Sequence, residues 1–403
     1  MDLMVKAEIK KSAVGELDYN PTAREYIFRY FDSGRPRVSL VMPPSQRIYL
    51  WKHQLHPFFE MYLPEGYLFE VFKNLLIKNY GEVNDYRLFS MLAPNIVGRV
   101  SFQSEQKKTT FPEVSLDDII NNDTEDTFSN LLRTFLRKNA ISGVQPKTLV
   151  TVRDKGAINT REYIVKTWGA EFPQLAENEY FCMQAVKRAG IFTPDVQLSR
   201  NRRFLVVERF DIDQKEGSSL GFEEVLGLMG KNREQKYTGS YEQVAKIFFQ
   251  AATDKLFSMQ QFFKLVTMNY LLKNGDAHLK NFGILYDEDI STINISPAYD
   301  VVCTVPYIFR DKPALTMLGR KAWFGKKELL DFGERHCQLS RTEILLSYEA
   351  CGESIIDTIK ALRDYIYNNP AFTVIGNRMI DAWTISLKQT TYGVMPDDVI
   401  GTW

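Results

Sequence analysis

The ten residues NGDAHLKNFG, from Asn274 to Gly283, bring a carboxylate, an imidazole, a lysine and two amides into one short stretch after an apolar helical run. Asp276 and Asn281 stand five positions apart in it. Phosphotransferases of the protein-kinase type use this spacing, since the aspartate meets the substrate hydroxyl and the asparagine holds a metal ion on the phosphates. The D-x4-N pair also arises by chance, and a solvated turn after a helix is the alternative interpretation. The stretch is therefore a candidate catalytic loop whose partners must be sought elsewhere in the chain.

A second carboxylate of suitable position is Asp300, in SPAYDVV. We expect it at the end of the second strand of a hairpin, FGILYDEDISTINISPAYD, that turns at Asp287-Glu288-Asp289 and brings the chain back to the candidate loop. Magnesium takes oxygen ligands from one or two carboxylates plus phosphate, so Asn281 and Asp300 are the predicted metal ligands. A turn or N-cap aspartate is the alternative for Asp300. The letters DFG also occur, at 331–333, but inside a pattern of helical periodicity with no preceding strand, so that aspartate is rejected.

Groups for nucleotide phosphates are expected earlier in the chain. Lys166 lies in the strand-like REYIVKTWG, and Glu179 on the next predicted helix is placed to hold it by an ion pair. No G-x-G-x-x-G motif is present, and SGVQPK, residues 142–147, is the candidate phosphate loop through its backbone amides. An exposed lysine and an ordinary Gly-Pro turn are the alternatives. The ordered set of strand lysine, helix glutamate, loop aspartate, asparagine and hairpin aspartate is much less expected by chance than any one member.

The elements that must position these residues fall into four segments. Residues 1–103 predict an α+β unit, with strands in MVKAEIK, YIFRYF and IVGRVSFQ and with helices broken at a Pro-Glu-Gly turn. Residues 104–127 are polar and acidic and predict a linker. Residues 128–215 predict a small strand-rich lobe with one main helix, which ends at Gly190. Residues 216–403 are mostly helical, with predicted helices at 241–254, 259–273, 326–337, 341–350, 353–367 and 374–387.

Composition narrows the classes of function. The chain has 403 residues, and its 50 basic and 50 acidic side chains cancel, which gives no support for general nucleic-acid binding but leaves a local basic patch open. Its four cysteines are scattered without a CxxC pair. This pattern predicts reduced thiols and not a disulfide framework or a zinc site. The sequence has no apolar signal-peptide core and no apolar run of transmembrane length. We therefore expect a soluble cytoplasmic protein.

Several stretches together resemble the HipA family of bacterial toxin-antitoxin serine/threonine kinases. They are SGVQPK, YIVKTWG, NEYFCMQ, ERFD, NGDAHLKNFG and SPAYD, and LPEG followed by VGRVSF resembles the amino-terminal subdomain of that family. The resemblance spans nearly the whole chain. It implies an α+β, protein-kinase-like fold of the PI3/4-kinase-like HipA type: a bilobal kinase with a small N-terminal α+β subdomain and a mainly α-helical C-terminal lobe.

The resemblance also implies roles for particular residues. Asp276 would be the catalytic base, Asn281 and Asp300 the Mg²⁺ ligands, and Lys166 the contact to the α and β phosphates of ATP. The other residues implied at the ATP site cover the triphosphate, form the hinge against adenine or line the phosphate end. They are Ser142, Gly143, Val144, Gln145, Pro146 and Lys147, then Glu208, Arg209 and Phe210, and then His278, Lys280 and Tyr299.

Substrate, partner and regulation are implied in the same way. Family members phosphorylate a serine on an aminoacyl-tRNA synthetase, with glutamyl-tRNA synthetase the best-known case, and growth stops. A small helix-turn-helix antitoxin, HipB, binds the toxin, so operator DNA would be reached only through the antitoxin. Members also autophosphorylate a serine just upstream of the phosphate loop. Here Ala140 stands where the family often has that serine, either as natural variation or as an engineered change, and Ser142 is the candidate regulatory phosphosite.

Two other functions remain open from the residues alone. A small-molecule kinase of similar lobe design would show much the same loop and later aspartate, but the N-terminal 100-residue domain and the Q-P-K loop argue against it. A pseudokinase that acts only as a co-repressor through an antitoxin is the other alternative. All five expected catalytic positions are filled, which argues against that reading.

Overall fold

The computed structural model describes residues 4–63, 84–104, 116–122, 124, 147–153, 160–166, 168, 171–212, 218–308 and 310–389. The chain forms two compact units. The first unit comprises residues 1–167, 199–235 and 285–291, and the second comprises 168–198, 236–284 and 292–403. The four segment boundaries expected from the sequence stay a prediction.

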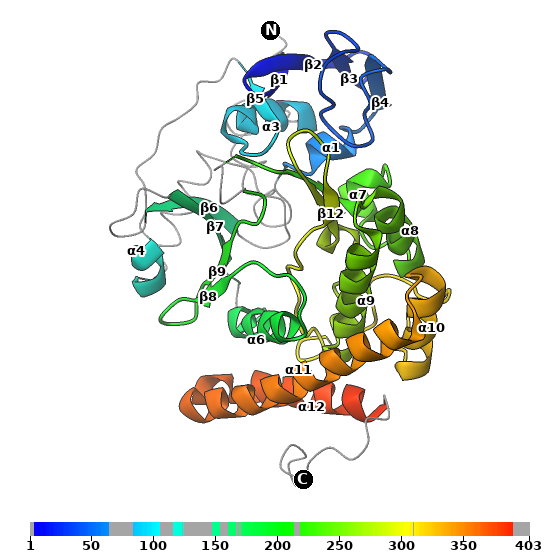
Figure 1. The fold of residues 1–403 in the computed structure, drawn as a ribbon. Helices are drawn as coiled ribbons and strands as arrows, with labels where there is room; N and C mark the ends of the chain where they lie inside the picture. Colours follow the sequence, from blue (N-terminus) through cyan, green and yellow to red (C-terminus); the bar gives the residue numbers. More distant parts are fainter. Residues whose placement is uncertain are drawn as a thin grey trace. The chain divides into compact units, whose positions relative to one another are not determined.

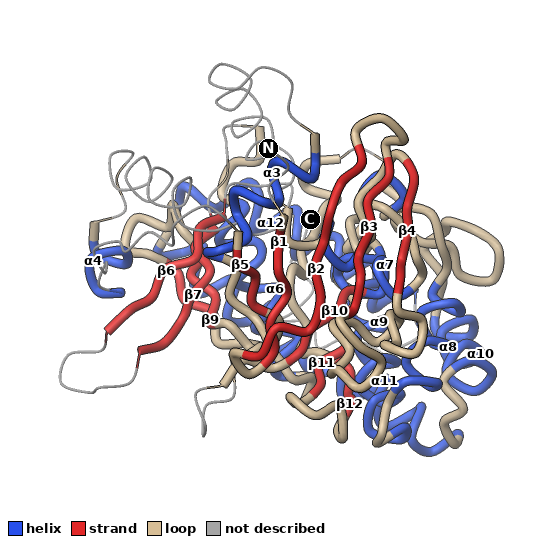
Figure 2. The backbone as a smooth tube through the Cα atoms, turned by 90° about the horizontal axis from the view of Figure 1, so that it is seen from above, coloured by secondary structure: helices blue, strands red, loops and turns tan. Residues whose placement is uncertain are grey.

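The first unit contains an antiparallel five-stranded sheet with the order β4-β3-β2-β1-β5, in which the strands lie side by side in Figure 2. Side chains alternate between buried and half-buried along β3, and this alternation places its three buried aromatic rings on one face. The strands expected in MVKAEIK, YIFRYF and IVGRVSFQ are confirmed as β1, β3 and β5, while β2 and β4 were not predicted. The bounds are β1 (Val5–Ile9), β2 (Ser12–Asn20), β3 (Glu25–Tyr30), β4 (Ile48–Lys52) and β5 (Ser101–Gln103).

Two helices, α1 (Pro57–Glu60) and α3 (Asp85–Leu92), complete the core of this sheet. The ring of Phe59 lies 5.4 Å from that of Phe28 on β3 and 5.6 Å from that of Phe89 on α3. These aromatic contacts join both helices to the buried face of the sheet, so residues 4–63 and 84–104 share one hydrophobic core.

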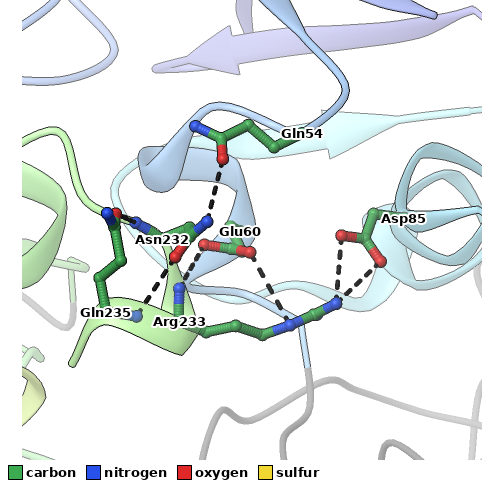
Figure 3. Close-up of polar contacts among 6 residues, drawn as sticks. All are labelled: Gln54, Glu60, Asp85, Asn232, Arg233 and Gln235. Carbon is green, nitrogen blue, oxygen red and sulfur yellow. Dashed lines mark hydrogen bonds and ion pairs between the residues drawn. The ribbon is translucent and has the colours of Figure 1, made fainter. Parts of the chain in front are cut away.

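A polar cluster in the same unit ties α1 and α3 to the short helix η2 (Arg233–Gln235), as Figure 3 shows. Arg233 Nη2 lies 3.2 and 3.3 Å from the two carboxylate oxygens of Asp85, and the backbone nitrogen of Arg233 donates to Glu60 Oε2 at 2.9 Å. The adjacent Asn232 donates from Nδ2 to Gln54 Oε1 at 3.0 Å. Gln54, Glu60 and Asp85 thus hold Asn232 and Arg233 at the start of η2.

A four-stranded sheet has the order β6-β7-β9-β8, formed by β6 (Lys147–Arg153), β7 (Thr160–Lys166), β9 (Leu205–Glu208) and β8 (Val196–Leu198). The strands predicted around Lys166 and in DVQLSR and RFLVVERFD are confirmed. Helix α4 (Leu116–Asn121), which falls in the segment expected to be a linker, packs on β7 and β9. The core between this helix and the sheet consists of Leu116, Ile119, Tyr163, Val165, Phe204 and Val206.

Strand β10 (Gly221–Glu224) carries a fully buried carboxylate in the first unit and leads into the short helix α7 (Val225–Leu228). Glu223 accepts hydrogen bonds from Ser39 Oγ at 2.6 Å, from the Leu40 nitrogen at 2.7 Å and from Tyr286 Oη at 2.8 Å. Burial raises the pKa of the Glu223 carboxyl, against the opposing effect of these donors. Gly221 lies against the ring of Tyr286, where a Cβ would come within 2.0 Å of a ring carbon, so no larger residue fits there.

The second unit is mainly helical, and Figure 1 shows α12 running beside the long α11. Helix α11 contacts α6, α9 and α12, and α9 is buried around most of its circumference. Serine caps begin α8 and α11 with reciprocal side-chain bonds to the third helical residue. The bounds are α6 (Leu175–Arg188), α8 (Tyr241–Ala251), α9 (Lys255–Leu271), α10 (Lys326–His336), α11 (Arg341–Asn368) and α12 (Thr373–Gln389).

One helix prediction was wrong in detail. The two helices expected at 341–350 and 353–367 are a single helix, α11. A glycine inside a helix costs only about 1 kcal/mol, and the buried stripe of Cys351, Ile355 and Ile359 continues across Gly352. The rejected DFG aspartate, Asp331, lies on helix α10, as its periodicity predicted.

All four cysteines are free and buried, which confirms the expectation of reduced thiols. Among the residues that the structure describes, no helix combines the length and the apolar character needed to cross a membrane.

Candidate active site

The candidate catalytic loop follows α9, and buried asparagine side chains shape its first turn. Asn274 Nδ2 donates to Asn269 Oδ1 at 2.9 Å, and Asn274 Oδ1 accepts from the backbone nitrogen of Asp276 at 3.2 Å. Lys273 before it has a left-handed backbone, with φ of 58°, which turns the chain out of the helix. The residues at the end of α9 therefore fix the position of the Asp276 backbone.

Gly275 has a steric reason to be glycine. Its nitrogen donates to Thr304 Oγ1 at 2.8 Å, and a Cβ on Gly275 would lie 1.8 Å from Asp311 Oδ2. Thr304 Oγ1 also lies within hydrogen-bonding distance of Asp311 and 2.9 Å from the Lys273 carbonyl, so these two acceptors share its one proton. The loop is thus packed against Thr304 and Asp311, neither of which the sequence interpretation had singled out.

Asp276 is half-buried and accepts a hydrogen bond from Tyr237 Oη to Oδ1 at 2.9 Å. The ring of Tyr237 stands edge-on to that of His278, with centroids 5.2 Å apart. The backbone nitrogen of Leu279 donates to the Lys236 carbonyl at 3.0 Å, so residues 236–237 run along the loop. Sequence reasoning missed Tyr237, which lies 39 residues before Asp276 and carries no local signal of its role.

Asn281 ends the short helix η3 (Leu279–Asn281), and its side chain folds back on the loop. Asn281 Oδ1 accepts from the His278 nitrogen at 2.9 Å, and the Asn281 nitrogen donates to the His278 carbonyl at 2.9 Å. An amide oxygen has two lone pairs, so this bond leaves acceptor capacity for a metal ion. His278 and Lys280 belong to the same turn as Asn281, and both are buried.

The prediction that Asp300 lies at the end of a strand was wrong. Strand β12 (Ile293–Ile295), which follows β11 (Gly283–Tyr286) in the hairpin, ends five residues earlier. Asp300 instead has a left-handed backbone with φ of 56°, a conformation that aspartate tolerates better than most residues. The neighbouring Tyr299 donates from Oη to the Lys280 carbonyl at 2.7 Å and so joins this segment to the catalytic loop.

Helix α6 holds the segment that follows Asp300. Buried Asn178 donates from Nδ2 to the Cys303 carbonyl and accepts from the Cys303 nitrogen through Oδ1, both at 2.8 Å. Asn178 and the predicted lysine partner Glu179 are neighbours on this helix, and both are buried. The helix that carries Glu179 is therefore also bonded to the chain just beyond the predicted metal ligand.

The residues present fit a magnesium ion bound together with a nucleotide. Asn281 and Asp300 offer hard oxygen ligands, and Mg²⁺ usually takes one or two carboxylates and completes its shell with phosphate and water. The described residues contain no group of three or more His, Cys, Asp and Glu side chains that would form an all-protein metal cage. A metal held in part by phosphate suits this donor set.

Lys166 is the last residue of β7, opposite Leu205 of β9, and only 4% of its surface is exposed. This burial removes the alternative that it is an exposed strand lysine. Lys166 belongs to the first unit and Glu179 to the second, and their ion pair stays a prediction.

The predicted adenine hinge follows β9. Arg209 is buried and hydrogen-bonds the Asp211 carboxylate and the Val97 carbonyl, the latter at 3.1 Å, so its guanidinium has structural partners. The Phe210 ring stands edge-on to Phe222, with centroids 5.4 Å apart. The contacts of Glu208 to Phe210 with adenine stay a prediction.

The predicted phosphate loop cannot be compared with the structure. Ala140 and Ser142 to Pro146 lie outside the described residues, as does the helix expected in TFSNLLRTFLRKN. Lys147 is the first residue of β6, and only its backbone is described.

Comparison with known families identifies the class of protein. The family of HipA-like C-terminal domains matches residues 139–364, which is more than half of the chain, and the family of HipA N-terminal domains matches residues 5–103. The chain belongs to the HipA family. The resemblance stated from the motifs is thereby confirmed.

Individual relatives agree with this assignment. A putative kinase of Haemophilus influenzae is 32% identical over 186 residues, which cover 42% of this chain and 53% of the relative, so the match spans about half of that protein. The putative kinase Y4dM of Sinorhizobium fredii is 24% identical over 307 residues, covering 69% of this chain and 70% of its own length.

A solved structure agrees in fold. HipA of Shewanella oneidensis, in a complex with HipB and its operator DNA, is 18% identical and superposes with a TM-score of 0.71 over 98% of this chain and 99% of its own. At this identity the likeness concerns the fold alone. The predicted mixed α and β, kinase-like fold of the HipA type is confirmed.

Proposed function

We propose that the chain is an ATP- and Mg²⁺-dependent protein kinase that phosphorylates serine or threonine hydroxyls. The observation that carries the proposal is the loop from Asn274 to Asn281, whose hydrogen bonds hold a carboxylate and an amide oxygen at the spacing that kinases use. The relatives named putative kinases support it.

In the proposed reaction Asp276 accepts the proton of the acceptor hydroxyl. The hydroxyl oxygen bonds to the γ-phosphorus while the bond from that phosphorus to the bridging oxygen breaks, and ADP leaves. Lys166 neutralises the α and β phosphates, and residues 142–147 cover the triphosphate. A magnesium ion held by Asn281 and Asp300 would supply positive charge at the phosphate oxygens. The transition state is loose, so these residues act mainly by position and charge.

We further propose that the kinase is a toxin that arrests growth and is neutralised by a HipB-like helix-turn-helix antitoxin. The Shewanella HipA was solved with HipB and operator DNA, and the likeness in fold supports a partner of the same kind. The proposed substrate is a translation component, with an aminoacyl-tRNA synthetase such as glutamyl-tRNA synthetase first in order. Ser142 is the proposed regulatory phosphosite, and the cytoplasm is the proposed location.

Phosphoproteomics after brief expression tests this function. Wild-type protein should raise phosphorylation of a serine or threonine on one or a few proteins, and Asp276→Asn should abolish the rise at equal expression. A synthetase among those proteins would support the proposed substrate. Identical phosphoproteomes for the two proteins would contradict kinase activity.

A further inference from the structure

Tyr237 touches the carboxylate that the proposed function makes the catalytic base. Its hydroxyl donates to Asp276 Oδ1 at 2.9 Å, within the range of a well-formed hydrogen bond. We propose that Tyr237 is a positioning residue, whose hydroxyl fixes the orientation of the Asp276 carboxylate for phosphoryl transfer. This inference rests on the proposed function.

The backbone around Tyr237 is held from two sides. The preceding carbonyl, of Lys236, accepts from the Leu279 nitrogen at 3.0 Å, inside the catalytic loop itself. The carbonyl of Tyr237 accepts from Lys321 Nζ at 3.1 Å. The phenol therefore approaches Asp276 from a segment whose backbone is itself hydrogen-bonded to the loop.

The ring of Tyr237 is also constrained. It stands edge-on to His278, and the ammonium of Lys236 lies 5.2 Å from its centroid. A ring with fixed neighbours presents its hydroxyl in one place, as a positioning group must.

The chemistry favours positioning. A general base works only when one of its oxygens points at the proton that it accepts, and a carboxylate that rotates freely spends little time there. A hydrogen bond from Tyr237 to Oδ1 restricts rotation of the carboxylate without taking its charge. Tyr237 is 41% exposed, so its side chain is accessible to solvent.

Purified full-length Tyr237→Phe tests the proposal, with ADP release at varied ATP as the readout. Losing one hydrogen bond to a charged group should lower kcat about tenfold, and KM for ATP should stay within about twofold, because the contact is not to nucleotide. Tyr367→Phe, at a tyrosine 87% exposed on α11, is the matched control and should retain wild-type kcat.

A double mutant separates positioning from a general structural effect. If Tyr237 acts through Asp276, Tyr237→Phe should lower the residual rate of Asp276→Asn no further, because the two groups form one unit. Equal losses in both backgrounds would overturn the proposal. An unchanged kcat in Tyr237→Phe would also overturn the proposal. A raised kcat would overturn it too, since it would mean that the phenol competes with the acceptor hydroxyl.

The outcomes also separate this inference from the function on which it rests. A wild-type protein that releases ADP at a rate unaffected by Tyr237→Phe refutes the inference alone. A wild-type protein with no ATP turnover and no phosphorylated product refutes both. Thermal unfolding midpoints of all variants, measured alongside, show whether a lost rate reflects a lost fold.

Discussion

Asp311 lies so close to Gly275 that a Cβ at position 275 would come within 1.8 Å of Asp311 Oδ2 and 2.5 Å of Asp311 Cγ. Asp311 cannot swing away freely, because its carboxylate also bonds Thr304 and accepts from the Lys312 nitrogen at 2.8 Å. Gly275→Ala should therefore displace the catalytic loop. We expect ~1–3 kcal/mol of lost unfolding free energy and a large fall in ATP turnover.

Gly98→Ala is the control for that substitution. A Cβ on Gly98 would meet its nearest atom at 3.8 Å, an ordinary contact, and the protein should lose little stability or activity. Urea unfolding and ADP release compare the two variants. Wild-type turnover in Gly275→Ala would mean that the close approach of Asp311 does not fix the loop.

Lys166→Ala should weaken nucleotide binding. The proposed contacts of this buried lysine with the α and β phosphates would be charge-assisted, so its loss should lower the affinity for ATP at least about tenfold. Titration calorimetry with ATP and Mg²⁺ measures this. Lys360→Ala removes a surface lysine whose side chain is 55% exposed and should leave affinity unchanged. The same ATP affinity in both variants would count against the placement of Lys166.

Glu223 should make stability depend on pH. Burial raises its carboxyl pKa above the ordinary value of 4.5, so the folded state favours the protonated form. The stabilisation from this group is complete below the ordinary value and is lost as the pH rises through the raised pKa. Glu223→Gln lacks this loss, so its stability relative to wild type should increase as the pH rises from roughly pH 4 to pH 8.

Urea unfolding of both proteins across this pH range measures the effect. Glutamine can still accept from Leu40 and Tyr286 through one oxygen and can donate to Ser39, so the bonds around position 223 survive the change. Glu353→Gln, at an exposed position on α11, should reproduce the wild-type profile. A constant difference between wild type and Glu223→Gln would refute the account of this carboxylate.

Arg233 should contribute measurably to the first unit. Its side chain is 23% exposed and pairs with Asp85 and with Glu60, whose side chain is 7% exposed. Arg233→Ala leaves those carboxylates without the guanidinium and should reduce the unfolding free energy by ~1–3 kcal/mol. Arg335 pairs with Asp331 on the surface of α10, with its side chain 69% exposed, and Arg335→Ala should stay within about 0.5 kcal/mol of wild type. Equal losses in the two variants would show that the lower exposure of Arg233 and its partners adds nothing to their contribution.

The sequence was most informative where the structure is local. Asp276, Asn281 and the turn between them lie within one loop, so their spacing carried the prediction. The cores of the helices were predicted because apolar residues recur along them at helical spacing. The strands β1 and β3 were predicted because apolar and polar residues alternate, and their burial alternates in the same way. Strand β2 escaped because its burial does not alternate strictly.

Contacts between distant positions could not be found this way. Tyr237 meets Asp276 across 39 residues, and Asn178 meets Cys303 across 125, and neither pair has a spacing that a pattern could reveal. The break predicted between residues 350 and 353 does not occur, because packing on the neighbouring helices outweighs the low helix propensity of Gly352.

Transfer of the γ-phosphoryl group by purified protein tests the central claim most directly. With labelled ATP and Mg²⁺, the wild type should release ADP and form a labelled protein product. Asp276→Asn should lose at least about 99% of that rate while keeping its unfolding midpoint, because removal of a general base costs on the order of a hundredfold or more. Transfer by a folded Asp276→Asn protein at a rate near that of the wild type would contradict the account.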